Sequence, residues 1–123
     1  MRLMTLLFAL FVGISAAWAE EDTSATTEIM KQCPYPSREK VNIPNGRRAT
    51  EQEMIDAQGT VKGFVSAGND YLACLDNLQA NWGEGITEEQ QAVLVIFHNK
   101  MVDEMQSIAD LFNAALAAYK GRR

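Results

Sequence analysis

The stretch over residues 87–119 constrains the fold more than any other part of the chain. It contains no proline and no glycine, and its apolar residues recur at alternating steps of three and four. This spacing is typical of a helix that packs along its length against another helix. The predicted seam of this helix is Leu94, His98, Met101, Met105, Ile108, Phe112, Ala115 and Tyr119. Thr87 and Gln90 form a capping-box pattern at its start, and Gly121 is typical of its end.

A second helix is predicted to start at Thr50, which forms a capping-box pattern with Glu53. Its seam residues also recur at steps of three and four, and they are Met54, Ala57, Val61, Phe64, Gly68, Tyr71, Leu75 and Leu78. Glycines inside a helix cost up to about 1 kcal/mol each relative to alanine, so a kink is an alternative to a straight helix. The glycine-containing break at residues 80–85 leaves only a short loop. The sequence therefore predicts an all-α fold built on an antiparallel two-helix hairpin.

The two cysteines, Cys33 and Cys74, predict one disulfide bond. They match no C-x-x-C redox motif and no zinc-ligand spacing, and an even pair in an oxidising compartment is typical of a disulfide. Three prolines between residues 33 and 46 disfavour a helix there. Extended chain over residues 33–50 reaches about 53 Å, farther than the helical rise of about 36 Å over residues 50–74. We expect an extended N-terminal strap that runs back along the hairpin and is pinned by the disulfide.

The N-terminus has the three-part pattern of a cleaved secretory signal peptide. Arg2 supplies a positive start, residues 3–14 are apolar, and Ala17-Trp18-Ala19 is an A-x-A cleavage signal. We therefore assign residues 1–19 to a signal peptide and expect a periplasmic or secreted protein without a transmembrane anchor after cleavage. A retained membrane anchor is the alternative. Residues 20–32 are predicted to form a flexible acidic tether, and residues 33–123 the helical hairpin domain.

Charge and motifs argue against several classes of function. The net charge is −5, whereas binding to nucleic acid needs clustered lysine and arginine. The glycines form no phosphate-binding loop, and the serines have no recognisable flanking motif. We predict no nucleic-acid partner, no cofactor, no catalytic residue and no enzymatic activity.

His98, Met101 and Met105 are the one candidate metal site. Imidazole and thioether ligands suit copper(I), and the two methionines follow the only histidine at steps that share one helical face. All three are also predicted seam residues, where methionine is an ordinary filler of space. Our main interpretation is packing without metal ligands, and a periplasmic copper(I)-binding or other metal-binding protein is the alternative.

The second helix of the hairpin has more apolar surface than one partner helix can cover. The surplus on one flank of the seam is a stripe of four residues, Val95, Val102, Ala109 and Leu116. On the other flank it is Phe97 and Leu111. Either the strap or another copy of the chain is expected to cover it, so self-association is one of the partner predictions. Trp82 and Tyr119 are candidate anchors for a protein partner, because aromatic residues are enriched at binding hot spots.

Several short segments between residues 33 and 120 form a recognisable set, namely Cys33-Pro34, Ile43-Pro44-Asn45-Gly46, Glu53-Met54, Val61-Lys62, Tyr71-Leu72-Ala73-Cys74, Val102-Asp103-Glu104-Met105 and Phe112-Asn113. Together they resemble an uncharacterised family of small secreted or periplasmic bacterial proteins. The resemblance implies export from a bacterial cell, and it assigns no activity and no site residue. We therefore predict an exported small helical structural or interaction protein of the bacterial cell envelope, with an envelope protein as its partner.

Overall fold

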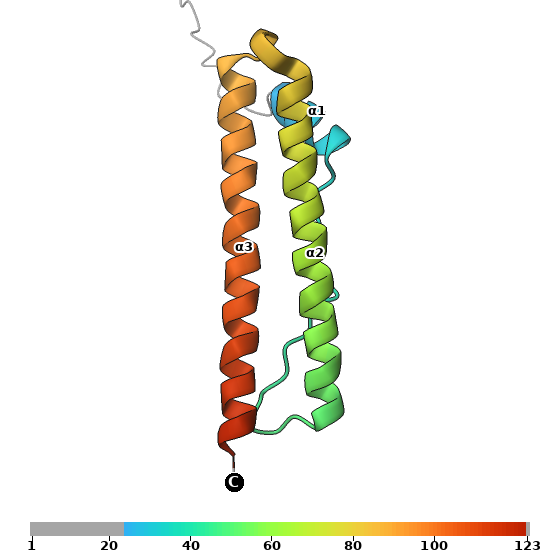
Figure 1. Ribbon diagram of the computed structural model, residues 1–123, viewed down its shortest axis with the longest axis vertical. Helices are drawn as coiled ribbons and strands as arrows, with labels where there is room; N and C mark the ends of the chain where they lie inside the picture. Colours follow the sequence, from blue (N-terminus) through green and yellow to red (C-terminus); the bar gives the residue numbers. More distant parts are fainter. Residues whose placement is uncertain (1–23, 123) are drawn as a thin grey trace, which may run out of the picture.

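Four helical elements make up the part of the chain that the computed structural model describes, residues 24–122. They are α1 (Ser24–Gln32), α2 (Glu51–Trp82), the short 3-10 helix η1 (Gly83–Gly85) and α3 (Glu88–Gly121). Figure 1 shows α2 and α3 side by side along their length, with α1 beside the end at which η1 connects them. These residues contain no strand, so the all-helical class is confirmed for them. The predicted signal peptide lies outside the described residues.

Side-chain caps define the starts of both long helices. The Thr50 hydroxyl oxygen accepts a hydrogen bond of 3.1 Å from the backbone N–H of Glu53. At α3, the Thr87 hydroxyl accepts from the backbone N–H of Gln90, and the Gln90 side-chain oxygen accepts from the backbone N–H of Thr87. Both threonines therefore cap their helices as predicted, but the two reciprocal bonds of a capping box are both formed only at Thr87 and Gln90. Gly83, with φ of 55°, ends α2 in a conformation that residues with a side chain rarely adopt.

The core lies between α2 and α3 and follows the predicted seams closely. The eight seam residues predicted for the first long helix are the eight buried residues of α2. In α3 the buried residues are Leu94, Met101, Ile108, Phe112 and Ala115. Met105 and Tyr119 are half-buried and pack against this core.

His98 is the one seam residue that the structure corrects, because it is exposed. Phe97, on the other flank of α3, is half-buried and packs against the core instead. Burying an imidazole away from water needs a hydrogen-bond partner for each polar nitrogen, whereas burying a benzyl group is favourable by itself. At this turn of α3 the side chain that packs against the core is therefore Phe97 and not His98.

Gly68 leaves room between α2 and α3 for two methionine side chains of α3. A Cβ atom at this position would lie 2.5 Å from the Met105 Sδ and 3.0 Å from the Met101 Cε. The space beside Gly68 is thus occupied by the two methionine side chains. Gly59 and Gly63 face open space, and α2 is continuous through all three glycines.

Alanine substitutions at Gly63 and Gly68 are expected to change stability in opposite directions. Gly63→Ala should raise the melting temperature, because alanine costs up to about 1 kcal/mol less than glycine within a helix. Gly68→Ala should lower it, because overpacking typically costs about 1–3 kcal/mol and exceeds that gain. Thermal unfolding followed by circular dichroism compares the two variants at equal protein concentration. An equal rise in both variants would contradict the close packing of the two methionines against Gly68.

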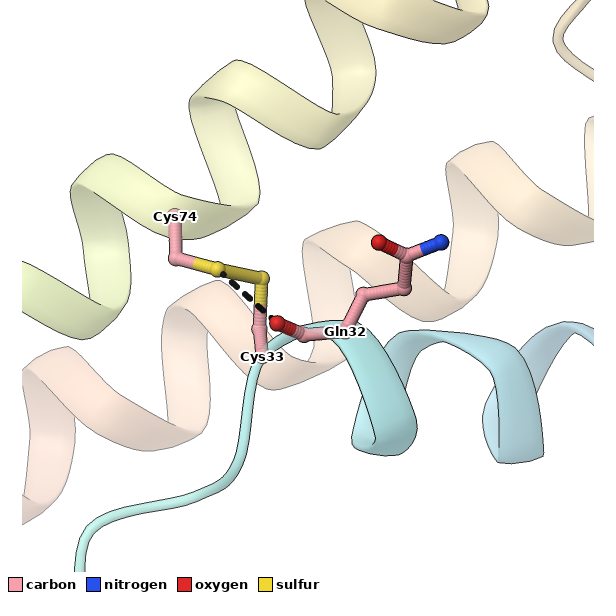
Figure 2. The surroundings of a disulfide bond; sticks show 3 residues. All are labelled: Gln32, Cys33 and Cys74. Carbon is pink, nitrogen blue, oxygen red and sulfur yellow. Dashed lines mark hydrogen bonds between the residues drawn. A yellow bond between two sulfur atoms is a disulfide. The ribbon is translucent and has the colours of Figure 1, made fainter.

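The segment between α1 and α2, which we call the strap (residues 33–50), contains no helix or strand. Figure 1 shows that it returns along the helix pair to the start of α2. Cys33 and Cys74 form the predicted disulfide bond, with their Cα atoms 5.8 Å apart (Figure 2). Near the other end of the strap, a Cβ on Gly46 would collide with the carbonyl oxygen of Ala115, so the backbones touch there. The strap is therefore held to α2 at one end and to α3 at the other.

The structure corrects the predicted flexible tether (residues 20–32) over residues 24–32, and residues 20–23 lie outside the described residues. Residues 24–32 form α1, in which Ala25 is buried and Ile29 is fully buried. Their spacing of four residues places both on one face of the helix, and α1 contacts both α2 and α3. The polar composition indicates a solvated segment, but two apolar side chains next to a covalent anchor are enough to dock one short helix. No helix among the described residues is long and apolar enough to cross a membrane.

Candidate functional site

Tyr35 connects the strap to both long helices. Its ring packs edge to face against that of Tyr71 in α2, with ring centroids 5.0 Å apart and an interplanar angle of 71°. From α3, the Lys100 Nζ lies 4.8 Å from the centroid of the Tyr35 ring, a cation–π contact. Tyr35 follows Cys33 by two residues, so the aromatic contacts and the disulfide hold the same part of the strap.

The electrostatics of this junction favour a structural role. The Tyr35 hydroxyl is buried and makes no direct hydrogen bond among the described residues. Burial raises the pKa of Tyr35 above its ordinary value, and the nearby Glu104 carboxylate raises it further. Burial also raises the pKa of Tyr71 to about 12. Both phenols therefore stay protonated at neutral pH, where neither can act as a general base.

The disulfide itself offers no reactive thiol. Its close-up shows the Gln32 carbonyl oxygen directed at the sulfur of Cys74, 3.5 Å away (Figure 2). An oxidised cysteine has no S–H proton to donate, so we regard this approach as a packing contact. Both cysteines are in the bond, and the described residues contain no free cysteine.

The three candidate metal ligands do not share one accessible site. His98 is exposed, Met101 is fully buried between α2 and α3, and Met105 is half-buried against Gly68. A metal ion would have to enter the core to reach the Met101 sulfur. Among the described residues, no group of three or more histidine, cysteine, aspartate or glutamate side chains is placed to hold a metal ion.

The side of the helix pair away from the strap is uncovered, and we call it the open face. On α2, the strap lies along the flank that contains Ala67 and Cys74, and the open face is the other flank. A groove of about 240 Å³ on this side is lined by both helices, including Asp76 of α2 and His98 of α3. The apolar residues of the open face are Val65, Leu72, Val95, Val102, Met105, Ala109 and Leu116. Val95 is 47% exposed and Val102 is 42% exposed.

The α3 part of the open face carries no aspartate, glutamate, lysine or arginine between residues 91 and 116. Its positions, which recur at helical spacing, are Gln91, Ala92, Val95, His98, Asn99, Val102, Met105, Gln106, Ala109, Asn113 and Leu116. Of the charged residues in the same range, Lys100, Asp103 and Glu104 lie on the other faces of the helix. Asp110 lies at the edge of the open face, where its carboxylate accepts a hydrogen bond of 2.9 Å from the Gln106 side-chain amide. Charged residues make up 22% of the whole chain, so their absence from the centre of this face over seven turns is a pattern. Depletion of charge around apolar residues is typical of the centre of a protein interface.

The sequence predictions found half of this face. They identified the apolar stripe with Val95 and Val102, but they did not identify the uncharged amides beside it. The missed signal is the recurrence of Asn99, Gln106 and Asn113 at intervals of seven residues. That period keeps the three amides on one side of a helix next to the stripe.

Comparisons with models of protein families, with curated proteins and with solved structures gave no match. The described residues define the class of protein as a small, all-helical protein with one disulfide bond and one open face, whose groove contains the carboxylate of Asp76. What such a protein does is therefore inferred from its own residues.

Proposed function

We propose that the protein is an exported structural or interaction protein of the bacterial cell envelope, and that it binds a protein partner through the open face. The observation that supports this most is the open face itself. It combines half-exposed valines with amides and lacks charged residues on α3, although it is not covered by any described part of the chain. Burying apolar surface that carries no charge costs little desolvation, so the α3 part of this face suits a partner better than water. On α2, the Asp76 carboxylate at the groove needs a polar group of the partner to pair with.

The expected location rests on the N-terminal pattern and on the disulfide. Disulfides persist in the periplasm and outside the cell, and they are rare in the reducing cytosol. A Cys33–Cys74 bond agrees with the export that the first 19 residues and the family resemblance suggest. We expect cleavage between Ala19 and Glu20 and a periplasmic or secreted mature protein.

A catalytic role has less support than a binding role. The ionisable groups of the groove on the open face are Asp76 and His98 alone, and the groove is small and open to solvent. The copper(I) alternative is also weaker, because a soft-ligand site would need the sulfur of the fully buried Met101. We therefore propose neither an enzyme nor a metal carrier.

Photo-crosslinking in cells tests the proposed function. A crosslinking amino acid is placed at Val102 on the open face, and at Leu111 as the matched control on the other flank of α3. The two side chains have similar exposure, 42% and 51%. We expect a crosslinked protein of the envelope fraction at position 102 and none at position 111, with a mature N-terminus at Glu20 by intact mass. Equal crosslinking at both positions, or a chain that keeps Met1 in the cytosol, would contradict the proposal.

A further inference from the structure

We infer that a second copy of this chain covers the open face, turned antiparallel, so that the two α2–α3 pairs form a four-helix bundle. This inference rests on the proposed function, because it names the partner of the same face. Three properties of the described residues point to a second copy: the dimensions of the face, the distribution of charge along α3 and a hollow at one end of it.

The dimensions of the open face match those of a stable dimer interface. Residues 91–116 of α3 span about 38 Å at 1.5 Å per residue, and two neighbouring helices are about 20 Å wide. The face therefore has a planar footprint of about 760 Å² per copy, of the same order as the roughly 800 Å² of accessible surface that each partner buries in a standard interface. In a four-helix bundle, the apolar residues of two helix pairs pack against each other in one shared core. Two copies of this chain could therefore bury their open faces against each other without any further element.

Charge determines which orientation of the second copy is favourable. The chain is acidic overall, with a net charge of −5, so two copies repel unless their contact surface carries little charge. The open face meets this requirement on α3, and the groove beside it on α2 contains one carboxylate, Asp76. The end at which η1 connects α2 and α3 is acidic, and it carries Glu84, Glu88 and Glu89. The opposite end, where α3 finishes and α2 begins, carries four basic residues, Arg47, Arg48, Lys120 and Arg122, beside Glu51 and Glu53 of the first turn of α2. The basic residues outnumber the acidic ones there, so this end is basic overall.

The basic end is a local cluster, because Arg122 Nη1 donates a hydrogen bond of 3.2 Å to the carbonyl oxygen of Arg47. In an antiparallel dimer each basic end lies beside the acidic end of the other copy. In a parallel dimer both pairs of ends carry like charges, which is unfavourable. The charge distribution of one chain is therefore complementary to itself only in the antiparallel arrangement.

A shallow, mostly apolar hollow of about 610 Å³ lies at the N-terminal end of α3. Its apolar lining is Ile86, Ala92, Val95 and Ile96, and Glu88 lies at the same hollow. At the opposite end of the open face Leu116 is half-buried and continues the same stripe. An antiparallel second copy brings its own Leu116 over this hollow. An apolar side chain thus meets an apolar recess at both ends of the dimer, as two-fold symmetry requires.

Sedimentation velocity of the oxidised mature protein over a concentration series tests whether the dimer forms and where. We expect the wild type to sediment as a dimer and Val102→Glu to associate at least about tenfold more weakly, because it buries a charge beside its symmetry mate. Leu111→Glu adds the same charge on the other flank and should leave association unchanged. A wild type that stays monomeric up to its solubility limit would overturn the inference, as would equal association of both variants.

Charge reversal tests the orientation. Glu88→Lys with Glu89→Lys should weaken the dimer, and so should Lys120→Glu with Arg122→Glu, because each places like charges at both contacts. Combining all four changes in one chain should restore association. This recovery cannot come from helix stability, because the combined variant opposes the helix dipole at both ends. Unchanged association in the two partial variants would overturn the antiparallel arrangement.

The outcomes separate this inference from the proposed function. A monomeric wild type whose Val102 crosslinks to a different envelope protein would overturn the second copy and support the proposed function. An antiparallel dimer formed by a chain that is never exported would support the second copy and overturn the proposed function.

Discussion

Replacing both cysteines, Cys33→Ala with Cys74→Ala, is expected to lower the free energy of unfolding by about 4 kcal/mol. The bond joins residues 41 apart in sequence. Without it, the unfolded chain is no longer closed into a long loop, so its conformational entropy rises and unfolding becomes more favourable. A small domain has a limited core, and a loss of this size removes a large share of its stability. Urea unfolding followed by circular dichroism, at one fixed protein concentration, measures the change.

Reduction of the wild type is the control for this pair of substitutions. A thiol reductant breaks the same bond without removing the sulfur atoms, so the reduced protein should lose a similar amount of stability. Unchanged urea midpoints in both samples would show that packing alone holds the strap and α1 in place. Loss in the variant without loss on reduction would instead assign the effect to the packing of the sulfur atoms.

Ile29→Ala is also expected to be strongly destabilising, with a loss of about 2–5 kcal/mol in the free energy of unfolding. The Ile29 side chain is fully buried between α1 and the long helices, so its truncation leaves a cavity. Met30→Ala is the matched control on the same helix, because Met30 is 53% exposed and its change should fall within about 0.5 kcal/mol. The same urea titrations compare the two variants. If both behave alike, residues 24–32 are the solvated tether that their composition indicates.

The disulfide and the docking of α1 are expected to support each other. The backbone N–H of Cys33 donates a hydrogen bond of 2.8 Å to the carbonyl oxygen of Ile29, so the last turn of α1 leads directly into the bond. A disulfide that holds residue 33 against α2 reduces the chain entropy lost when Ile29 docks. The effect of Ile29→Ala should therefore be smaller once the disulfide has been removed, which a double-mutant cycle measures.

The sequence alone was sufficient for the two long helices, their caps and the α2 seam. These features depend on residues that are close in the chain: a threonine before a helix satisfies amides three residues later, and apolar side chains at steps of three and four share one face. The pairing of Cys33 with Cys74 needed no structure either, because the chain has no other cysteine. Helix caps and seams depend on residues close in the chain, and a disulfide between the only two cysteines leaves no choice of pairing.

The tertiary structure decided which residues from distant parts of the chain meet. The polar composition of residues 24–32 predicted a solvent-exposed segment. In the structure Ile29 is fully buried, because α1 packs against both α2 and α3. The spacing allowed His98 a place in the seam, but the rotation of α3 against α2 brings Phe97 to the core instead. The contact of Tyr35 with Tyr71 and Lys100, and the side of the hairpin that stays open, depend on where the strap runs. Periodicity describes one helix at a time, whereas these outcomes depend on the packing of several elements against each other.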